Sequence, residues 1–281
     1  MKKEISIRLL LPHWPEWKIK LGDFFLNSAP LMYIGHANKL LHKHRGKKNS
    51  VLIEAISQDV GVEPVLHNGE NLPKTGPVTI VANHPGGADI IATVVALSKV
   101  RKDIVILANR LICLEPLKDL VIPVDTLGRK KVDQNQIDEA YQQGKAVVFF
   151  AAGKNSRYNE KGELRDRKWR TSFLSYAKRY NSPIVLMHID GTNSPLFYKV
   201  SKIRERYEKL KNVPLENLFQ LKELLTAKGK INLTLSKPID IHAIVEKGDS
   251  QEKLRNQAHK MQEFLYSPDF QSTDFLATVE Q

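Results

Sequence analysis

Short, mainly apolar segments alternate with longer helical ones along most of the sequence. The clearest apolar runs are PVTIVAN (77–83), DIVILAN (103–109), AVVFFAAG (146–153) and SPIVLMHIDG (182–191). Runs of this length, bounded by Gly, Pro or Asn, are typical of buried strands. A helical pattern, ADIIATVVALSKV (88–100), follows the first of them. This alternation predicts an α/β domain, with a central sheet and helices on its faces.

The first 70 residues have a different composition. Aromatic and aliphatic residues in WPEWKIKLGDFFLNSAPLMYIG (14–35) precede the basic cluster HKHRGKK (42–48). This order is typical of an interfacial helical segment whose cations meet anionic head groups, although a helical arm packed on the main domain would look similar. We therefore expect a helical, aromatic and basic arm over residues 1–70. The α/β domain, with a C-terminal helix, would then occupy residues 71–281.

The chain carries a large positive charge, because 43 Lys and Arg residues exceed 31 Asp and Glu residues and leave a formal net charge of +12. That charge favours an anionic partner: nucleic acid, a membrane surface, an acidic carrier protein or a phosphorylated substrate. The single cysteine, Cys113, allows no disulfide within the chain, which indicates a reducing compartment. No apolar window approaches the roughly 20 residues of a membrane-spanning helix, so we expect a protein that is soluble or rests on a membrane.

The stretch NHPGGADI (83–90) places two ionisable residues, His84 and Asp89, where the first strand should end and a helix begin. Strand ends of open α/β sheets commonly bind ligands. His84 can accept a proton near neutral pH if Asp89 holds its other ring nitrogen. Residues five apart do not share a helix face, so the Gly86–Gly87 turn must fold His84 back toward Asp89. Alternatively, Asp89 only caps the helix and His84 is a polar loop residue.

A second stretch, FFAAGKNSR (149–157), runs from a buried strand into a glycine turn with cations. Backbone N–H groups near Gly153, together with Lys154, Ser156 and Arg157, would form an anion site. A solvated basic hairpin is the alternative interpretation. Other chemistries lack support, because the sequence has no G-x-S-x-G elbow, no H-E-x-x-H zinc motif and no P-loop spacing.

Together these blocks resemble the glycerolipid acyltransferase superfamily, the lysophosphatidic acid acyltransferase-like proteins. The family signature N-H-x-x-x-x-D matches NHPGGAD, at His84 and Asp89. LANRLICLEPLKDLVIPVD (107–125) is similar to the second family block. FFAAGKNSR takes the place of the third block, F-P-E-G-T-R-S, and PIVLMHIDG (183–191) that of the V-P-V-type fourth block. The resemblance spans about residues 77–240.

The match is closer to a bacterial branch often labelled hemolysin-like, related to the O-acyltransferases that make ornithine and other amino-acid lipids. There the third block is similar to F-P-A-G-x-x-S-R, and D-x-x-W and G-x-N-S-x-x-F follow it. This sequence has DRKW (166–169) and GTNSPLF (191–197). Ala151 and Ala152 replace the Pro and Glu of the third block, and Met187 replaces the usual Pro of the fourth. Because the family links that Glu to acceptor binding, glycerol 3-phosphate-type acceptors are disfavoured.

The resemblance implies a mixed, mostly parallel sheet of the glycerol-phosphate acyltransferase-like fold, and an O-acyltransferase that acylates a lyso-lipid. The donor would be an acyl-carrier protein thioester or acyl-CoA, and the acceptor a lyso-amino-acid lipid or lysophosphatidic acid. His84 would be the general base, oriented by Asp89. The expected head-group residues are Lys154, Ser156 and Arg157 with the Gly153 turn, and Arg110 and Arg129 are weaker candidates. No cofactor or divalent metal is implied.

The same resemblance implies a peripheral protein on the cytoplasmic face of the bacterial inner membrane, docked on anionic lipid through residues 14–48. A non-catalytic lipid-binding or scaffold protein that keeps the fold is the alternative, although a scaffold has no use for the His84–Asp89 pair. Nucleic acid is not expected as a partner. The sequence has no recognised nucleic-acid-binding module, and its aromatic residues are not interleaved with the Lys and Arg of the core.

Overall fold

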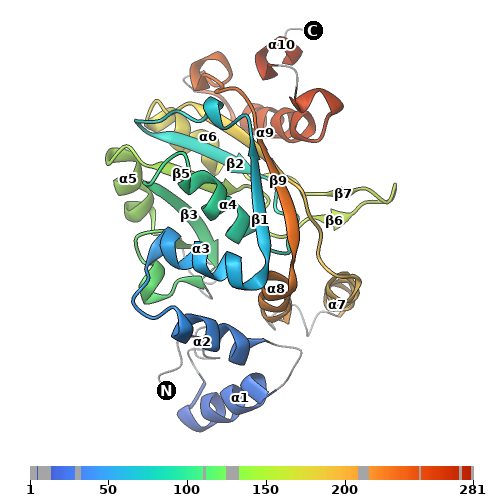
Figure 1. Ribbon diagram of the computed structural model, residues 1–281. Helices are drawn as coiled ribbons and strands as arrows, with labels where there is room; N and C mark the ends of the chain where they lie inside the picture. The colour runs from blue at the N-terminus through green and yellow to red at the C-terminus, as the bar shows by residue number, and fades with distance from the viewer. Residues whose placement is uncertain are drawn as a thin grey trace.

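The computed structural model describes residues 5, 14–28, 33–109, 112–124, 133–207, 215–246, 248–271 and 274–279. A seven-stranded sheet forms its centre, and helices cover both faces (Figure 1). Its strands are β1 (Val62–His67), β2 (Val78–Ala82), β3 (Ile104–Asn109), β4 (Val121–Val124), β5 (Ala146–Phe150), β8 (Ile184–Ile189) and β9 (Gly229–Leu235). They lie in the order β1-β9-β8-β2-β5-β3-β4. All neighbouring strands are parallel except β8 and β9, which confirms the mixed, mostly parallel sheet.

The helices lie before, between and after the strands along the chain. Three precede the main run of strands: α1 (Glu16–Ser28), α2 (Ile34–Lys43) and α3 (Asn49–Val60). The others are α4 (Asp89–Ser98), α5 (Gln134–Gln142), α6 (Ser172–Arg179), α7 (Pro195–Arg206), α8 (Leu215–Thr226), α9 (Gln251–Leu265) and α10 (Phe275–Val279). A small antiparallel hairpin, β6 (Arg157–Tyr158) and β7 (Leu164–Arg165), projects from the domain between β5 and α6 (Figure 1).

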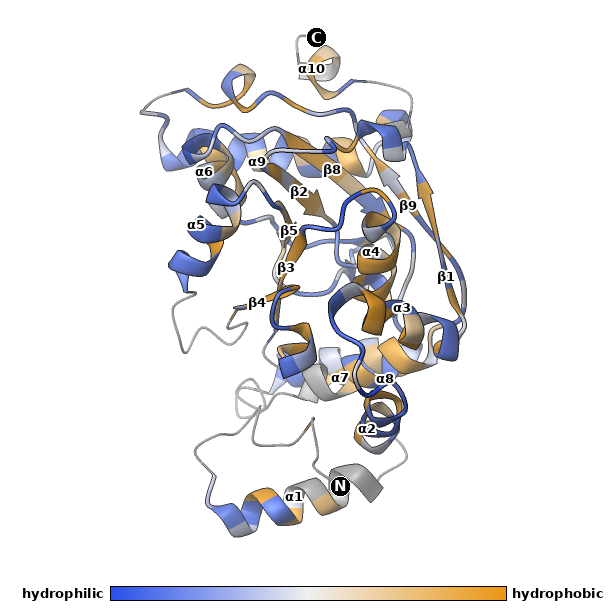
Figure 2. Ribbon diagram, turned by 60° about the vertical axis from the view of Figure 1, so that its left-hand side comes forward, coloured by the Kyte–Doolittle hydropathy of each residue, from blue (hydrophilic) through white to orange (hydrophobic). Residues whose placement is uncertain are grey.

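Alternate residues of the central strands enter two separate cores, one on each face of the sheet. In β2, Ile80 and Ala82 belong to the core under α3 and α4, whereas Val81 belongs to the core under α5, α6 and α9. Because helices bury both faces, these strands carry apolar residues at nearly every position; the buried Thr79 of β2 bonds to Tyr141 and Ser182. Figure 2 shows the resulting concentration of apolar residues in the central strands and α4. The four apolar runs of the sequence therefore form β2, β3, β5 and β8 as expected.

One local prediction was wrong, because residues 62–67 fall in the segment expected to be helical but form the edge strand β1. β1 pairs in parallel with β9, and most of its residues are only partly buried. It also contains Pro64, which edge strands tolerate because one side of the strand has no ladder partner. A half-exposed strand with a proline lacks the continuous apolar pattern that identified the central strands.

The N-terminal segment contains both packed and exposed parts. α2 buries Ile34 and Leu40 in the core beneath it, whereas α1 and the residue pair before it expose Trp14, Trp17 and Phe24. The side chains of residues 25–32, part of the expected interfacial arm, lie outside the described residues. None of the helices that the structure describes is long and apolar enough to cross a bilayer.

Candidate active site

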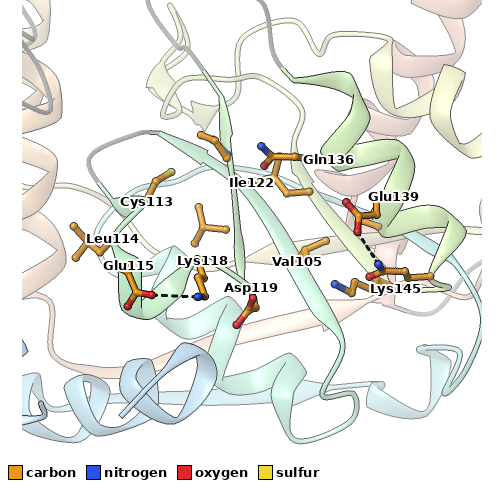
Figure 3. Close-up of a pocket in the computed structure, with 14 residues that line it drawn as sticks. Val105, Cys113, Leu114, Glu115, Lys118, Asp119, Ile122, Gln136, Glu139 and Lys145 are labelled. Atoms are coloured by element: carbon orange, nitrogen blue, oxygen red, sulfur yellow. Dashed lines mark hydrogen bonds and ion pairs between the residues drawn. The ribbon is translucent and has the colours of Figure 1, made fainter. Parts of the chain in front are cut away.

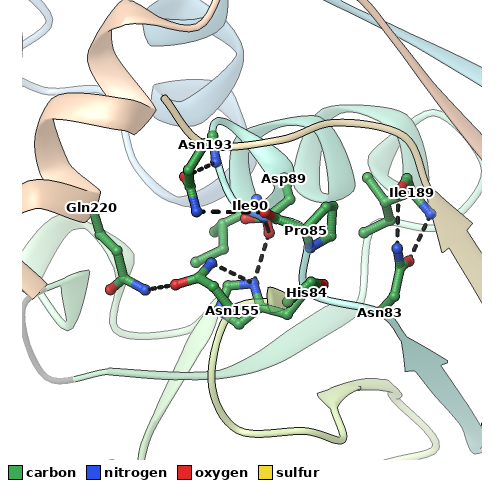
Figure 4. Close-up of polar contacts among 12 residues, drawn as sticks. Asn83, His84, Pro85, Asp89, Ile90, Asn155, Ile189, Asn193 and Gln220 are labelled. Carbon is green, nitrogen blue, oxygen red and sulfur yellow. Dashed lines mark hydrogen bonds and ion pairs between the residues drawn. The ribbon is translucent and has the colours of Figure 1, made fainter. Parts of the chain in front are cut away.

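His84 and Asp89 lie at the carboxyl end of the central strand β2, on either side of a glycine turn that leads into α4 (Figure 4). Gly86 and Gly87 both have positive φ angles, +101° and +64°, which residues with a Cβ rarely adopt. A Cβ on Gly86 would also lie 2.0 Å from the Asn193 side chain. The Gly-Gly pair is therefore required by the turn that folds His84 back toward Asp89, as the spacing of the two residues predicted.

The imidazole of His84 is held by a buried carboxylate. His84 Nδ1 lies 2.6 Å from Asp89 Oδ2, and Asp89 is 2% exposed. The same carboxylate accepts the N–H groups of Gly86 (2.8 Å) and Ile90 (2.7 Å). An ionised carboxylate can only accept, so Nδ1 carries the hydrogen and Nε2 keeps its lone pair. The ring therefore has the tautomer that a general base needs.

The surroundings of His84 affect its protonation in opposite ways. The Phe150 ring packs against the imidazole, with 4.6 Å between centroids. Burial lowers the pKa of His84, but the charge and hydrogen bond of Asp89, helped by the charge of Asp166, outweigh burial and raise that pKa above its ordinary value. The surroundings thus stabilise the protonated form of the imidazole.

The loop after β5 binds the His84 backbone from both sides. Ser156 N–H donates to the His84 carbonyl oxygen (2.8 Å), and His84 N–H donates to Asp166 Oδ1 (3.1 Å). Asp166 also accepts the Ser156 hydroxyl (2.6 Å) and the Trp169 indole N–H (2.9 Å). Burial raises the pKa of Asp166 despite these hydrogen bonds. The DRKW block therefore positions His84, a role that its sequence pattern did not indicate.

The GTNSPLF block supports the other half of the turn. Asn193 Oδ1 accepts the Gly87 N–H (2.7 Å), and Asn193 Nδ2 lies 3.4 Å from the Pro85 carbonyl oxygen (Figure 4). The next residue, Ser194, caps α7 and is held by the buried Glu223 of α8 through its N–H and hydroxyl, both at 2.6 Å. Residues 191–194 thus connect α7 and α8 to the turn between His84 and Asp89.

The expected head-group residues are placed in different ways. Lys154 is exposed, whereas Ser156 is buried with its hydroxyl directed at Asp166. Arg157 lies over the Phe197 ring at 5.2 Å and donates to the carbonyl oxygens of Asn155 and Ser156 (both 3.1 Å). Its guanidinium therefore braces the loop, and a contact with substrate stays a prediction.

The remaining residues expected at the anion site are Gly153, Arg110 and Arg129. Gly153 has a φ of +64°, and an added Cβ would lie 3.4 Å from the Arg170 guanidinium, so the glycine is needed for the turn after β5. Arg110 and Arg129 lie outside the described residues.

Two residues beside His84 were missed as candidates. Asn155 is 2% exposed, and its Nδ2 lies 3.5 Å from His84 Nδ1. Gln220 of α8 donates from Nε2 to Asn155 Oδ1 (Figure 4). Asn155 lies inside the third block but was not singled out there, and Gln220, 65 residues away, belongs to no motif, so only the tertiary fold brings the two side chains together.

An apolar cavity of about 80 Å³ lies next to the turn. Ile90, the residue after Asp89, lines it together with side chains of α2, α3, α4 and α8, all of them apolar. Ile90 directly follows Asp89 and donates its N–H to that carboxylate, so the cavity begins one residue from the His84–Asp89 pair.

A second, polar hollow of about 510 Å³ runs along the edge strand β4 and shares no lining residue with the His84 site (Figure 3). Lys118 and Lys145 line it with several carboxylates, and Lys118 lies 3.2 Å from Glu115. Cys113 is half-buried and lines this hollow. Within the described residues, no three His, Cys, Asp or Glu side chains are arranged to hold a metal ion.

Comparisons with known proteins agree with the sequence resemblance. The family model described as Acyltransferase matches residues 34–268. The chain is 30% identical over 217 residues to the lyso-glycine lipid O-acyltransferase of Phocaeicola vulgatus, which covers 74% of this chain and 77% of that protein. It is 28% identical over 207 residues to the protein of the same name from Bacteroides thetaiotaomicron, with coverage of 72% and 75%.

Among solved structures, the 1-acyl-sn-glycerophosphate acyltransferase PlsC of Thermotoga maritima aligns with 87% of this chain and 94% of its own, at 16% identity and a TM-score of 0.47. The family match covers most of the chain and includes the β2–α4 turn, the loop after β5 and the block before α7. The chain therefore belongs to the Acyltransferase family and is an acyltransferase.

Proposed function

We propose that the protein transfers a fatty acyl group from a thioester donor to the hydroxyl of a lyso-lipid, with His84 as general base. The buried His84–Asp89 pair carries this proposal. Asp89 holds Nδ1, and the other ring nitrogen is left with a lone pair for the acceptor hydroxyl. A lipid-binding scaffold would gain nothing from this arrangement, which buries a carboxylate against an imidazole.

A lyso-amino-acid lipid is the acceptor that we favour. The two relatives similar over about three quarters of the chain are both named for a lyso-glycine lipid. The third block of family members that acylate glycerol 3-phosphate-type acceptors contains a Glu linked to acceptor binding. In this chain Ala152 takes its place and is buried in the core. Lysophosphatidic acid is the second candidate acceptor.

The reaction needs no covalent intermediate on the protein. The acceptor hydroxyl gives its proton to His84 Nε2 as its oxygen attacks the thioester carbon, and the carbonyl oxygen becomes an oxyanion. The C–S bond then breaks, the ester C–O bond remains, and the imidazolium returns its proton to the leaving sulfur. Asp89 stabilises the imidazolium between these steps. The raised pKa of His84 is consistent with that role.

The apolar cavity next to Ile90 would hold the donor acyl chain. Burying methylenes against apolar walls is favourable by about 0.8 kcal/mol each. The cavity begins beside the residue that follows Asp89, so a chain lying in it would leave its thioester near His84. Its volume of about 80 Å³ is small for a long chain, so entry requires α2 and α8 to move apart from α4.

The exposed aromatic side chains of the N-terminal segment would dock the protein on anionic lipid. Trp17 and Phe24 are 62% and 63% exposed, and they recur at helical spacing with Trp14 and Leu21. A variant with Trp17→Ser and Phe24→Ser should float less with anionic liposomes than the wild type. Val51→Ser, which removes an equally exposed apolar residue from α3, is the matched control. Equal flotation of all three proteins would contradict docking through α1.

The direct test is acyl transfer by the purified protein to lyso-glycine lipid or lysophosphatidic acid, from acyl-carrier protein and from acyl-CoA. We expect His84→Ala to lose about 10²- to 10⁴-fold in rate. His259→Ala on the exposed surface of α9 should retain wild-type activity. An inactive wild type with both acceptors and both donors would favour the scaffold function instead.

A further inference from the structure

A buried carboxamide lies beside the catalytic imidazole and has not been assigned a role. Asn155 follows the β5 strand and the Gly153 turn, and its side chain points toward His84 (Figure 4). Its Oδ1 accepts a hydrogen bond from Gln220 Nε2, which fixes the orientation of the amide. Its Nδ2 is thereby directed at the imidazole, 3.5 Å from His84 Nδ1.

The contact between Asn155 Nδ2 and His84 Nδ1 is not a satisfied hydrogen bond. Nδ1 carries the hydrogen that it donates to Asp89 at 2.6 Å, so it has no lone pair to accept another. A buried donor without an acceptor costs about 1–3 kcal/mol, which native structures rarely leave unexplained. This N–H group is therefore available to an acceptor that arrives with the substrate.

The backbone amides near His84 are already used by the turn itself. Gly86 and Ile90 donate to Asp89, and Gly87 donates to Asn193. His84 N–H donates to Asp166. These amides give the turn its conformation and are not available to stabilise a negative charge on the substrate. A side chain from another segment can supply the donor at the reacting carbon.

We propose that Asn155 Nδ2 donates a hydrogen bond to the oxyanion formed at the thioester carbonyl, and that Gln220 is the positioning residue for this amide. This inference rests on the proposed acyl transfer and names a further catalytic residue for it. Side-chain amides act in this way because a fixed donor aimed at developing charge needs no reorganisation during the reaction. α8 thereby contributes to catalysis as well as to the wall of the apolar cavity.

Replacing Asn155 by Ala should lower kcat by about 10²- to 10³-fold at saturating donor and acceptor, with KM changed by only a few-fold. Asn155→Asp keeps an oxygen for Gln220 but has no N–H and adds negative charge, so its kcat should be no higher than that of Asn155→Ala. The acid limb of the pH profile should stay in place in the Ala variant, because the His84–Asp89 pair is intact. Gln220→Ala should lower kcat by less than either Asn155 variant does.

Asn159→Asp, the same change in the turn of the exposed hairpin, is the control and should retain wild-type kcat. Melting temperatures check that each variant is folded. Wild-type kcat in either Asn155 variant, or a loss confined to KM, would overturn the oxyanion role while leaving acyl transfer intact. An inactive wild type would refute the proposed function and this inference together, so the two failures are distinguishable.

Discussion

Replacing Asp89 by Asn tests the catalytic pair most directly, because the change is nearly isosteric and alters only hydrogen-bonding capacity and charge. The two Asp89 oxygens accept three donors: His84 Nδ1 and Gly86 N–H at one oxygen, and Ile90 N–H at the other. An Asn side chain has one oxygen and one NH₂ group. In either amide orientation, the NH₂ group must face at least one of these donors.

The magnitude of the effect depends on which orientation the amide takes. If the Asn oxygen faces His84 and Gly86, the NH₂ group opposes Ile90 N–H, and a buried unsatisfied donor costs about 1–3 kcal/mol of folding stability. If the NH₂ group faces His84, it donates to Nδ1 and moves the imidazole hydrogen to Nε2. That tautomer cannot accept the hydroxyl proton, so the general-base contribution of about 10²- to 10⁴-fold is lost.

The pH dependence provides a second readout. Burial lowers the pKa of His84, and Asp89 raises it above the ordinary value. His84 must be neutral to accept a proton, so kcat/KM of the wild type falls as the pH drops below that raised pKa. In Asp89→Asn the burial effect remains without the opposing carboxylate. The pKa of His84 should therefore fall, and the acid limb of the profile should move to lower pH.

The assay is steady-state acyl transfer at a series of pH values, with a melting curve for each protein. Asp138→Asn on α5, which removes a carboxylate bonded to Arg179 and Tyr180, is the matched control and should leave the kcat/KM profile unchanged. A mutant with wild-type kcat would refute the orienting role of Asp89. A large rate loss with an unmoved acid limb would show that the limb belongs to another group.

Three further predictions follow from the supporting contacts. Gly86→Ala should abolish activity and lower the melting temperature more than Gly162→Ala, because both glycines have positive φ but only Gly86 has a side chain, that of Asn193, in the space of the new Cβ. Asp166→Asn should lower kcat by about tenfold or more, since its NH₂ group must face a donor from His84, Ser156 or Trp169; wild-type kinetics would exclude a positioning role. Val94→Phe, in the wall of the apolar cavity, should lower kcat/KM for long acyl donors more than for short ones, and an unchanged chain-length profile would place the acyl chain elsewhere.

The sequence predicted the parts of the fold whose environment is uniform along a segment. β2, β3, β5 and β8 are buried on both faces, so they appear as continuous apolar runs. β1 was missed because an edge strand with Pro64 is only half-buried and shows no such run. The catalytic turn was recognisable because His84, two glycines and Asp89 are close in sequence, and the family signature has the same spacing.

Residues that reach the site from distant segments could not be predicted in this way. Asp166 was recognised as part of a motif, but its carboxylate contacts the backbone of a residue 82 positions away. Gln220 reaches Asn155 from a helix with no motif of its own. Arg157 was expected in an anion site because it is a cation after a glycine turn. In the structure it braces its own loop and packs on Phe197, and its contact with substrate stays a prediction.

The residues of the loop after β5 also affect which acceptor the site can bind. Where the best-known members of the superfamily have charged Glu and Arg in the third block, this chain has Ala152 and Asn155. Ala152 is buried in the core and cannot contact substrate, and Asn155 is the neutral side chain nearest the imidazole in that block. Of those two family residues only the Arg can bind phosphate, so Asn155 removes one bidentate phosphate partner from this position. Competition between a lyso-amino-acid lipid and lysophosphatidic acid in one assay would measure the preference of the site directly.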